Sequence, residues 1–313
     1  MTGQVVKCLS RECEVEQNGK RFVVALRGKL KQEPQSVLVG DFVDFDENLL
    51  VIERVLPRKN RLIRPFVANV DQVVVVVAEQ PKPDLLVVDQ AIIGAQKQEL
   101  PVVLVVNKID QNSQNFASEI KSDYDRVVNK IVEVSAASGE KISELKQLLK
   151  GKLSVLVGAS GVGKSSLINA LSTSAVQKTG DLSAKITRGK NTTRSNEIFS
   201  FNFGAKTIDS PGFSAFSLGT IEPAELARAY TDFAPYACHC AFTSCNHVSQ
   251  TDCAVKQAVK SGQISKNRYE RYCTLFEKYQ ADWQNRYRRK KEKNNENFTI
   301  NNSRRLSKRT KTK

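Results

Sequence analysis

The sequence predicts an α/β protein in which a parallel sheet follows a small β-barrel and precedes a cysteine-rich helical domain. Three observations predict this class. Short strand-like segments fill residues 4–65, buried apolar runs alternate with helical stretches over residues 69–153, and helical patterns dominate after residue 222. With 313 residues, the chain has room for two or three modest domains, each with its own core.

The N-terminal part has the pattern of a barrel. Its segments RFVVALRG (21–28), DFVDFD (41–46) and LLVIERVLP (49–57) are short, rich in β-branched and aromatic residues, and separated by turn-forming sequence. Such segments are typical of antiparallel β-structure. We expect a β-barrel over residues 1–65.

The next part alternates buried strands with helices. The runs VDQVVVVVAE (70–79), PVVLVV (101–106), LSVLVG (153–158) and KTIDSPG (206–212) are apolar strands, and helical stretches follow the first three. This alternation indicates a parallel sheet covered by helices. We expect the α/β core over residues 66–218, a helical domain over 219–285 and a tail over 286–313.

The net charge of +15 is concentrated in the tail. Residues 286–313 contain twelve Lys or Arg and two Glu, so they carry ten of the fifteen net charges. The tail has too few apolar residues to order itself, which predicts disorder, but it can neutralise phosphates. RNA is the expected partner, and a merely solubilising tail is the alternative.

Hydropathy and cysteine content indicate a cytoplasmic protein. The longest apolar runs are far shorter than the roughly 20 residues that span a bilayer, and the N-terminus lacks a signal core. A disulfide framework is not expected, because thiols in the cytosol stay reduced. We expect Cys8, Cys13 and Cys273 to be ordinary buried thiols, no membrane partner and, by default, a monomer.

A phosphate-binding loop lies between a strand and a helix. The sequence GASGVGKS (158–165) matches G-x-x-x-x-G-K-[ST], and its backbone N–H groups can surround phosphate oxygens. Lys164 would bridge the β- and γ-phosphates, and Ser165 would bind Mg²⁺. The predicted phosphate contacts are Gly158, Ala159, Ser160, Gly161, Val162, Gly163, Lys164, Ser165 and Ser166.

A second motif selects the base. Asn107, Lys108, Ile109 and Asp110 form NKID at the carboxyl end of a strand, where ligands bind in open α/β sheets. The Asp110 carboxylate can accept from guanine N1–H and from the N2 amino group, whereas adenine offers no such pair of donors. The sequence therefore predicts guanine. Ser135 and Ala136 lie where a loop would meet guanine O6.

A third motif would sense the γ-phosphate. Asp209 begins DSPG (209–212), so Asp209 would hold Mg²⁺ through water and the Gly212 N–H would contact the γ-phosphate. The polar stretch KITRGKNTTRSN (185–196) lies between this motif and the phosphate loop and is suited to a switch. Thr193, or else Thr192, would bind Mg²⁺ when a triphosphate is present.

The order of these motifs is permuted. In ordinary GTPases of this class the phosphate loop precedes NKxD, whereas here NKID at Asn107 precedes the loop at Gly158. A permutation is feasible because the termini of a domain usually lie close together. The new exit point follows DSPGF, so the switch leads directly into the cysteine-rich domain.

Over nearly its whole length the chain resembles the ribosome small-subunit-dependent GTPase family (RsgA, also called YjeQ). The resemblance rests on the permuted motifs and on VLPRKNRLIRP (55–65), GASGVGKSSLINAL (158–171), IDSPGFSAF (208–216) and CAVKQAVKSGQISKNRYERY (253–272). It implies an N-terminal OB-fold, a circularly permuted P-loop GTPase core and a C-terminal zinc domain. It also implies a role in late maturation of the small ribosomal subunit.

The cysteine-rich domain has the ligands for one zinc ion. Cys240, Cys245, His247 and Cys253 give C-x4-C-x-H-x5-C, the spacing of the family, and supply three thiolates and one imidazole. A closed site with four protein ligands is structural. Cys238 and His239 are expected to be non-ligands, and a cluster of thiols lining a small core is the alternative.

The water-positioning glutamine of Ras-like enzymes has no counterpart here. Phe213 follows the DSPG motif, and Asn191 stands where relatives often carry a histidine before the paired threonines. Asparagine can orient water but is not a general base. We therefore expect slow intrinsic hydrolysis and assistance from a partner.

The sequence thus predicts a GTPase that converts GTP to GDP and phosphate, with Lys164, Thr193, Asp209 and Gly212 in the catalytic roles. Small (30S) ribosomal subunits and their rRNA would bind and stimulate it. The alternative is an RNA-binding assembly protein whose nucleotide site turns over little. A permuted GTPase that serves the large subunit is disfavoured by the N-terminal barrel.

Overall fold

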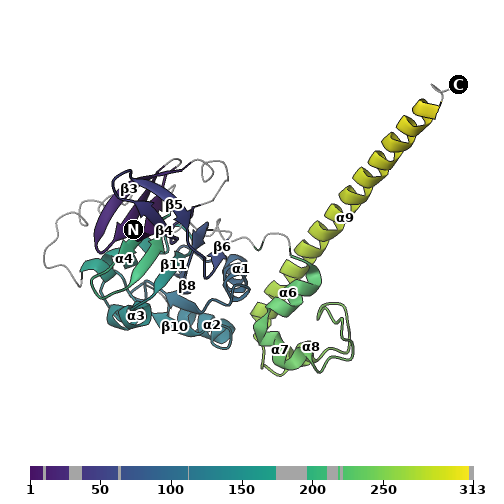
Figure 1. Ribbon diagram of the computed structural model, residues 1–313. Helices are drawn as coiled ribbons and strands as arrows, with labels where there is room; N and C mark the ends of the chain where they lie inside the picture. The colour runs from purple at the N-terminus through teal and green to yellow at the C-terminus, as the bar shows by residue number, and fades with distance from the viewer. Residues whose placement is uncertain are drawn as a thin grey trace. The chain divides into compact units, whose positions relative to one another are not determined.

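The computed structural model describes residues 1–9, 12–27, 37–62, 65–111, 113–173, 196–209, 218 and 221–309. The chain divides into two compact units, Met1–Leu218 and Gly219–Lys313. Figure 1 shows the first unit as strands and helices together and the second as helices alone. No helix of the described residues is long and apolar enough to cross a membrane.

Five strands close the predicted barrel. They are β1 (Thr2–Cys8), β2 (Glu12–Gln17), β3 (Lys20–Leu26), β4 (Phe42–Asp46) and β5 (Val51–Val55). β1 pairs with both β2 and β4, β2 pairs with β3, β3 with β5, and β5 with β4, so the ring has no free edge. Alternate side chains, such as Val43 and Phe45 of β4, fill the interior. The OB-type barrel is confirmed.

Six strands form the sheet of the core in the order β10-β9-β8-β11-β13-β12. Five are parallel, and only β12 runs antiparallel to its neighbour β13. The strands are β8 (Gln72–Val77), β9 (Val102–Val106), β10 (Lys130–Glu133), β11 (Leu153–Val157), β12 (Glu197–Ser200) and β13 (Lys206–Asp209). Strand β11 precedes the phosphate loop and lies between β8 and β13, although three strands of the sheet come before it in the chain. The structure therefore confirms the permuted core.

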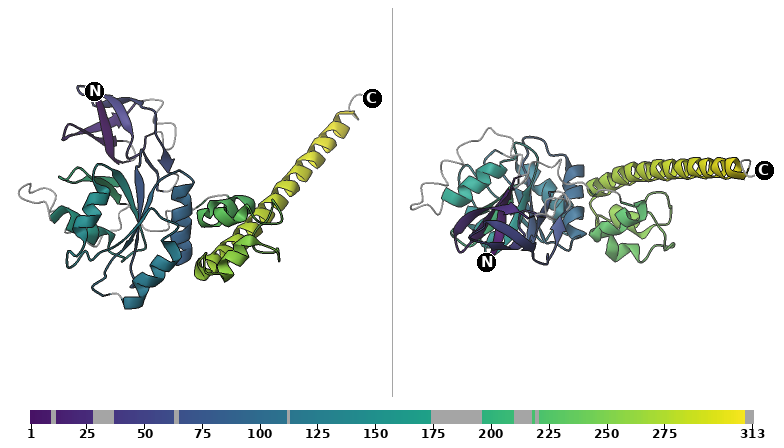
Figure 2. Two further views of the ribbon diagram at one scale, coloured as in Figure 1. Left: turned by 90° about the horizontal axis from the view of Figure 1, so that it is seen from below. Right: turned by 45° about the horizontal axis from the view of Figure 1, so that its top comes forward.

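Helices cover both faces of this sheet, as Figure 2 shows. On β8, Val73, Val75 and Val77 belong to one buried cluster, which also contains residues of α1 and α2. Val74 and Val76 point the other way, into the cluster formed with α3 and α4. The helices are α1 (Leu85–Gln96), α2 (Gln114–Tyr124), α3 (Ile142–Leu149) and α4 (Lys164–Thr173).

The barrel and the sheet are continuous. Lys7 of β1 pairs in register with Glu197 of β12, and its ammonium lies 3.3 Å from the Glu197 carboxylate. Lys206 of β13 donates to Gln4 and Glu16 of the barrel at 2.9 and 3.1 Å. A short two-stranded sheet of β6 (Arg61–Leu62) and β7 (Val67–Ala68) lies on the segment that connects the two parts.

The second unit contains the helices α6 (Pro223–Ala229), η3 (Thr231–Phe233), α7 (Ala234–Ala237), α8 (Ala254–Lys260) and α9 (Lys266–Arg309). Its core is built around Arg268, which is fully buried. The guanidinium donates to the Asp232 carboxylate at 3.1 and 3.2 Å and lies 4.6 Å from the centre of the Tyr230 ring. Tyr272 of α9 is buried against the Tyr230 ring, and Phe276 packs against Tyr272.

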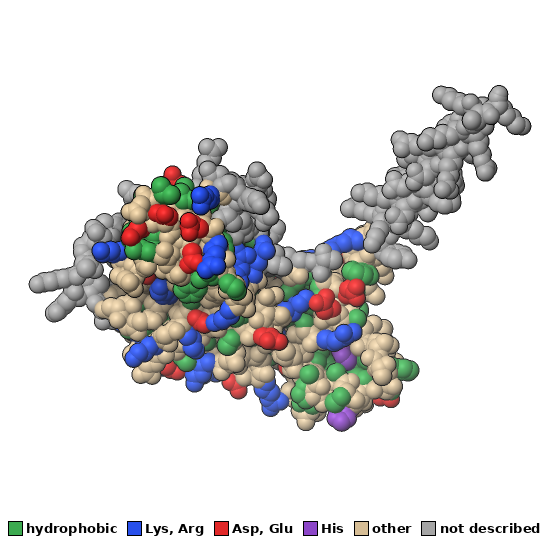
Figure 3. Space-filling model, in the orientation of Figure 1, with side chains coloured by type: hydrophobic (Ala, Val, Ile, Leu, Met, Phe, Trp, Pro, Cys, Tyr) green, Lys and Arg blue, Asp and Glu red, His purple; other side chains and the backbone are tan. Residues whose placement is uncertain are grey.

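One expectation needs correction. Helix α9 continues to Arg309, so the backbone of residues 286–309 is helical where the sequence predicted a disordered tail. Those residues include no Gly or Pro, and twelve of them are Lys, Arg or Glu, which are good helix formers, so elongation from the packed start of α9 costs little. Over the face drawn in Figure 3, basic and acidic side chains are interspersed rather than gathered by sign.

We predict that the buried ion pair stabilises the second unit. Asp232→Ala removes the carboxylate that faces the buried Arg268 guanidinium. The free energy of unfolding should fall by about 3 kcal/mol. Urea unfolding measures this change. The fluorescence of Trp283, the single tryptophan, reports the unfolding of the second unit. Glu270→Ala is the matched control, because it removes an exposed ion pair with Lys266 worth no more than about 0.5 kcal/mol. Equal effects of the two substitutions would contradict the prediction.

Candidate nucleotide site and metal centre

The phosphate loop lies at the carboxyl end of β11 and leads into α4, which begins at Lys164. Three positions of this loop need glycine, either because a Cβ would clash or because the backbone has a positive φ. A Cβ on Gly158 would lie 2.5 Å from the Val76 carbonyl oxygen, and Gly161 and Gly163 have φ of +82° and +95°. A Cβ on Gly163 would also lie 2.3 Å from the side-chain nitrogen of Asn107. The backbone can therefore form the tight loop that surrounds phosphate oxygens.

Lys164 folds back over this loop. Its ammonium donates to the carbonyl oxygens of Gly158 and Ala159, at 2.8 and 3.0 Å. Burial lowers the pKa of Lys164, and the nearby Asp209 carboxylate opposes that shift. Both of these acceptors are neutral carbonyls. The oxygens of a charged phosphate are better acceptors, so the Lys164 ammonium can move from the carbonyls to a phosphate.

Asp209 ends β13 and has a buried oxygen suited to a cation. Among the described residues no hydrogen-bond partner reaches its Oδ1 atom, which is inaccessible to solvent. Burial raises the pKa of Asp209, and the Lys164 charge opposes the rise. A buried, unpaired carboxylate oxygen beside a phosphate loop fits Mg²⁺, which prefers oxygen ligands.

Asn107 connects the NKID segment to the phosphate loop and to the Ser135–Ala136 loop. It is buried at the end of β9, its side-chain nitrogen donates to the Val162 carbonyl at 2.8 Å, and its side-chain oxygen accepts from the Ala136 N–H at 3.1 Å. Lys108 has a φ of +62° and donates to the Gln80 carbonyl at 3.0 Å. The structure thus brings NKID, the phosphate loop and the Ser135–Ala136 loop together, as the sequence predicted.

Ser135 orients the Asp110 carboxylate. Its hydroxyl donates to Asp110 Oδ1 at 2.5 Å and accepts from the Ser138 N–H at 3.0 Å. The hydrogen bond from Ser135 lowers the pKa of Asp110, so the exposed carboxyl is ionised at neutral pH. An exposed, ionised and oriented carboxylate can accept from two donors on one edge of guanine.

Sequence reasoning missed two features of this loop. It treated Ser135 only as part of a backbone contact, although a serine directly after a buried strand can hydrogen-bond a neighbouring strand end. The Ala136 N–H donates to Asn107, so the next N–H of the loop, that of Ala137, becomes a second candidate to meet guanine O6.

The remaining predicted nucleotide residues divide into two groups. Ser165 and Ser166 are exposed at the first turn of α4, and Ser160 and Gly161 are exposed in the loop. The switch residues Thr192 and Thr193, the γ-phosphate sensor Gly212, and Asn191 and Phe213 lie outside the described residues.

Four side chains of the second unit form a cluster that can hold zinc. One ligand atom from each of Cys240, Cys245, His247 and Cys253 lies within 4.8 Å of all the others. Three of the separations are 3.5, 3.7 and 3.9 Å. A tetrahedron with Zn–S of about 2.3 Å and Zn–N of about 2.1 Å has edges of about 3.6–3.8 Å, so the cluster has the size of a zinc site.

Hydrogen bonds from α8 and α9 hold the loop that carries these ligands. Tyr269 and Tyr272 of α9 donate to the carbonyl oxygens of His247 and Asn246 at 2.7 and 2.5 Å. Lys256 of α8 donates to two carbonyls of the same loop at 2.7 and 2.8 Å. Neither Cys238 nor His239 belongs to the cluster, and the Cys238 side chain is exposed.

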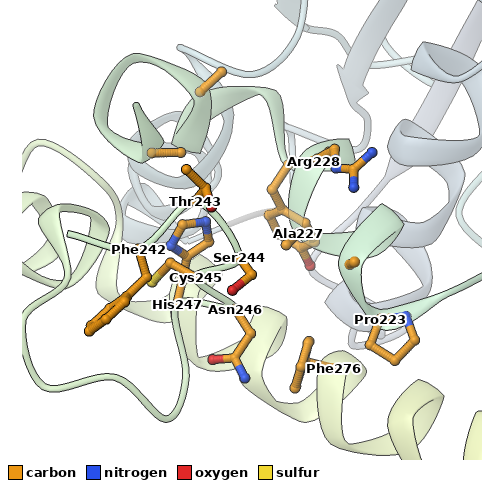
Figure 4. Close-up of a pocket in the computed structure, with 14 residues that line it drawn as sticks. Pro223, Ala227, Arg228, Phe242, Thr243, Ser244, Cys245, Asn246, His247 and Phe276 are labelled. Carbon is orange, nitrogen blue, oxygen red and sulfur yellow. The ribbon is translucent and has the colours of Figure 1, made fainter. Parts of the chain in front are cut away.

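A cavity of about 600 Å³ opens beside the cluster (Figure 4). Cys245 and His247 border it from the loop, Phe276 borders it from α9, and Ala227 borders it from α6. The remaining wall is mostly apolar, and the cavity lies entirely within the second unit. It is therefore not part of the nucleotide site.

Comparisons with known proteins agree with this geometry. The family model RsgA GTPase matches residues 55–219, and RsgA N-terminal domain matches residues 2–49. The small ribosomal subunit biogenesis GTPase RsgA of Thermotoga neapolitana is 39% identical over 84% of this chain and 90% of its own length. The protein of that name from Agathobacter rectalis is 35% identical, over 88% and 97% respectively.

Two solved structures are similar. The crystal structure of YjeQ from Thermotoga maritima has a TM-score of 0.74 and 38% identity, covering 89% of this chain and 98% of that one. The structure of YloQ, described as a circularly permuted GTPase, has a TM-score of 0.70 and 26% identity, covering 90% and 95%.

We predict that nucleotide binding depends on Lys164. Lys164→Ala removes the ammonium that would meet the phosphates and should weaken GDP binding by about 100-fold. Fluorescence titration with labelled GDP measures the affinity, and zinc content should not change. Lys150→Ala, an exposed lysine at the end of α3, is the matched control. Retained affinity in the Lys164 variant would refute the phosphate-loop assignment.

We also predict one structural zinc ion, held without Cys238. Metal analysis should find one zinc per chain in the natural protein and in Cys238→Ser, and none in Cys245→Ser. Chelation should unfold the second unit, which a change in Trp283 fluorescence reports. Loss of zinc from the Cys238 variant would show that the ligand set is different.

Proposed function

Because the chain belongs to the RsgA GTPase family and is therefore a GTP-hydrolysing P-loop enzyme, we propose that it acts in late maturation of the small ribosomal subunit, which stimulates its hydrolysis of GTP. The observation that supports a working nucleotide site is the pair of hydrogen bonds made by the Asn107 amide, which connect the phosphate loop and the Ser135–Ala136 loop to the NKID segment. The ribosomal part of the proposal rests on the names of the relatives. Its relatives bear the name of small ribosomal subunit biogenesis GTPases.

Guanine recognition is assigned to Asp110. Ser135 fixes one carboxylate oxygen and favours the ionised form, so the carboxylate can accept from guanine N1–H and N2–H. An adenine at this place offers no matching donors, and the carboxylate would lose its water without compensation. The site therefore favours GTP and GDP over the adenine nucleotides.

Phosphate binding and catalysis are assigned to the loop and to its two charged neighbours. Lys164 would move from the Gly158 and Ala159 carbonyls to the β- and γ-phosphates. Ser165 and Asp209 would hold Mg²⁺, which neutralises charge on the phosphates. We assign Thr193, or else Thr192, and Gly212 to the contacts that distinguish GTP from GDP.

The need for a partner follows from the sequence of the switch. Phe213 has no group that can orient water, and Asn191 can orient it but cannot accept a proton as a base. Hydrolysis by the protein alone should therefore be on the order of 10⁻⁴ per second. A small subunit would supply or position the missing group.

Chain connectivity offers a route from nucleotide to partner. In the chain, residues 210–218 connect Asp209 to the second unit, so a change at the switch would be passed along the chain to that unit. The GTP form would bind an immature subunit in the cytoplasm, and hydrolysis would release it. The barrel and the basic α9 would contact rRNA, with zinc holding the second unit folded.

We predict that small subunits stimulate GTP hydrolysis by on the order of 100-fold or more. Phosphate release is measured for the full chain alone, with small subunits and with large subunits. Lys164→Ala is the control that shows the turnover belongs to this site. Stimulation by large subunits would favour a large-subunit GTPase, and binding without stimulation would favour an assembly protein with little turnover.

A further inference from the structure

Two cysteines of the barrel lie in direct contact across neighbouring strands. Cys8 at the end of β1 and Cys13 in β2 are register partners, and their sulfur atoms are 2.6 Å apart. Non-bonded carbon atoms settle at roughly 3.5–4.0 Å, and sulfur is no smaller. A disulfide bond is about 2.05 Å long, so the observed separation is nearer to a bond than to an ordinary contact.

The backbone around the pair permits a bond. The Leu9 N–H donates to the Glu12 carbonyl at 2.8 Å, which places Cys8 and Cys13 at the adjacent, non-hydrogen-bonded position of the antiparallel ladder. Opposite residues at such positions have Cα atoms about 4.5 Å apart, within the range of about 4.4–6.8 Å that disulfides span. Both side chains pack against the barrel core, so they share one face of the hairpin.

The two thiols differ in their access to a reagent. Cys13 is only 2% exposed, whereas Cys8 is half-buried. Cys8 can therefore meet an oxidant from solvent, and Cys13 can reach only Cys8. This division between an attacking and a resolving thiol is the arrangement that closes a disulfide by exchange.

We propose that Cys8 and Cys13 form a reversible disulfide, a thiol-modification site on the β1–β2 hairpin that reacts with low-molecular-weight disulfides. The Cys8 thiol loses its proton and attacks one sulfur of the small disulfide, which forms a mixed disulfide and releases one thiol. The Cys13 sulfur then attacks the Cys8 sulfur, loses its proton and releases the second thiol. Two protein thiols are oxidised and one small disulfide is reduced to two thiols.

The position of the pair gives the bond a consequence. Cys8 packs against the buried clusters of both the barrel and the sheet, and it follows Lys7, which pairs with Glu197 of β12. A bond at Cys8 would lock the hairpin at the place where the barrel joins the core. Disulfides in a reducing compartment are usually transient and redox-sensing, which fits a reversible bond here.

Tryptic mapping tests the proposal on the full zinc-loaded chain. Trypsin cleaves after Lys7, Arg11 and Lys20, so the two cysteines fall in separate peptides, residues 8–11 and 12–20. The protein is incubated with oxidised glutathione, free thiols are alkylated under acid quench, and the digest is analysed without reduction. Hydrogen bonding to Cys13 and burial raise the pKa of Cys8, so the exchange is slow and incubation should last hours.

We expect the two peptides to appear linked in more than half of the chains and to separate after reduction. Cys238→Ser, which removes an exposed thiol outside the pair, should leave the link intact, and Cys8→Ser should abolish it. In Cys13→Ser, Cys8 should stop at the mixed disulfide with glutathione. Peptides that remain separately alkylated in the natural protein, or that carry only glutathione, would overturn the proposal.

Discussion

The amide of Asn107 is the contact on which the nucleotide site depends. One side chain satisfies a carbonyl of the phosphate loop and an N–H of the Ser135–Ala136 loop, and all three loops lie far apart in the sequence. The contact also explains Gly163, since any Cβ there would collide with the Asn107 side chain. Because the amide is buried, losing either hydrogen bond would leave a polar group unpaired inside the protein.

The permuted order leaves this arrangement intact because the sheet, and not the chain order, places the loops. β10, β9, β8 and β11 are neighbours and parallel, so their carboxyl ends meet at one edge. What the permutation changes is the exit from the core. β13 is the last strand of the sheet among the described residues, and the chain after Asp209 continues to the second unit.

The motifs could be recognised in the sequence because each carries its chemistry in a short stretch. The spacing of Cys240 to Cys253 and the loop from Gly158 to Ser165 needed no tertiary information. What the sequence missed depends on contacts between distant segments: the hydrogen bond from Ser135 to Asp110, the buried Asp209 oxygen to which no described residue donates, and the pairing of Arg268 with Asp232. The length of α9 was missed because composition indicated disorder, while helix propensity and a packed start of the helix favour elongation.

The central claim is that Asp110 reads guanine in a site assembled from permuted loops. The most direct test compares the dissociation constants of GDP and xanthosine diphosphate for the natural protein and for Asp110→Asn. Xanthine carries a carbonyl where guanine has the N2 amino group, which an asparagine amide can donate to and a carboxylate repels. The natural protein should prefer GDP and the variant should prefer xanthosine diphosphate. A variant that still prefers GDP would contradict the claim.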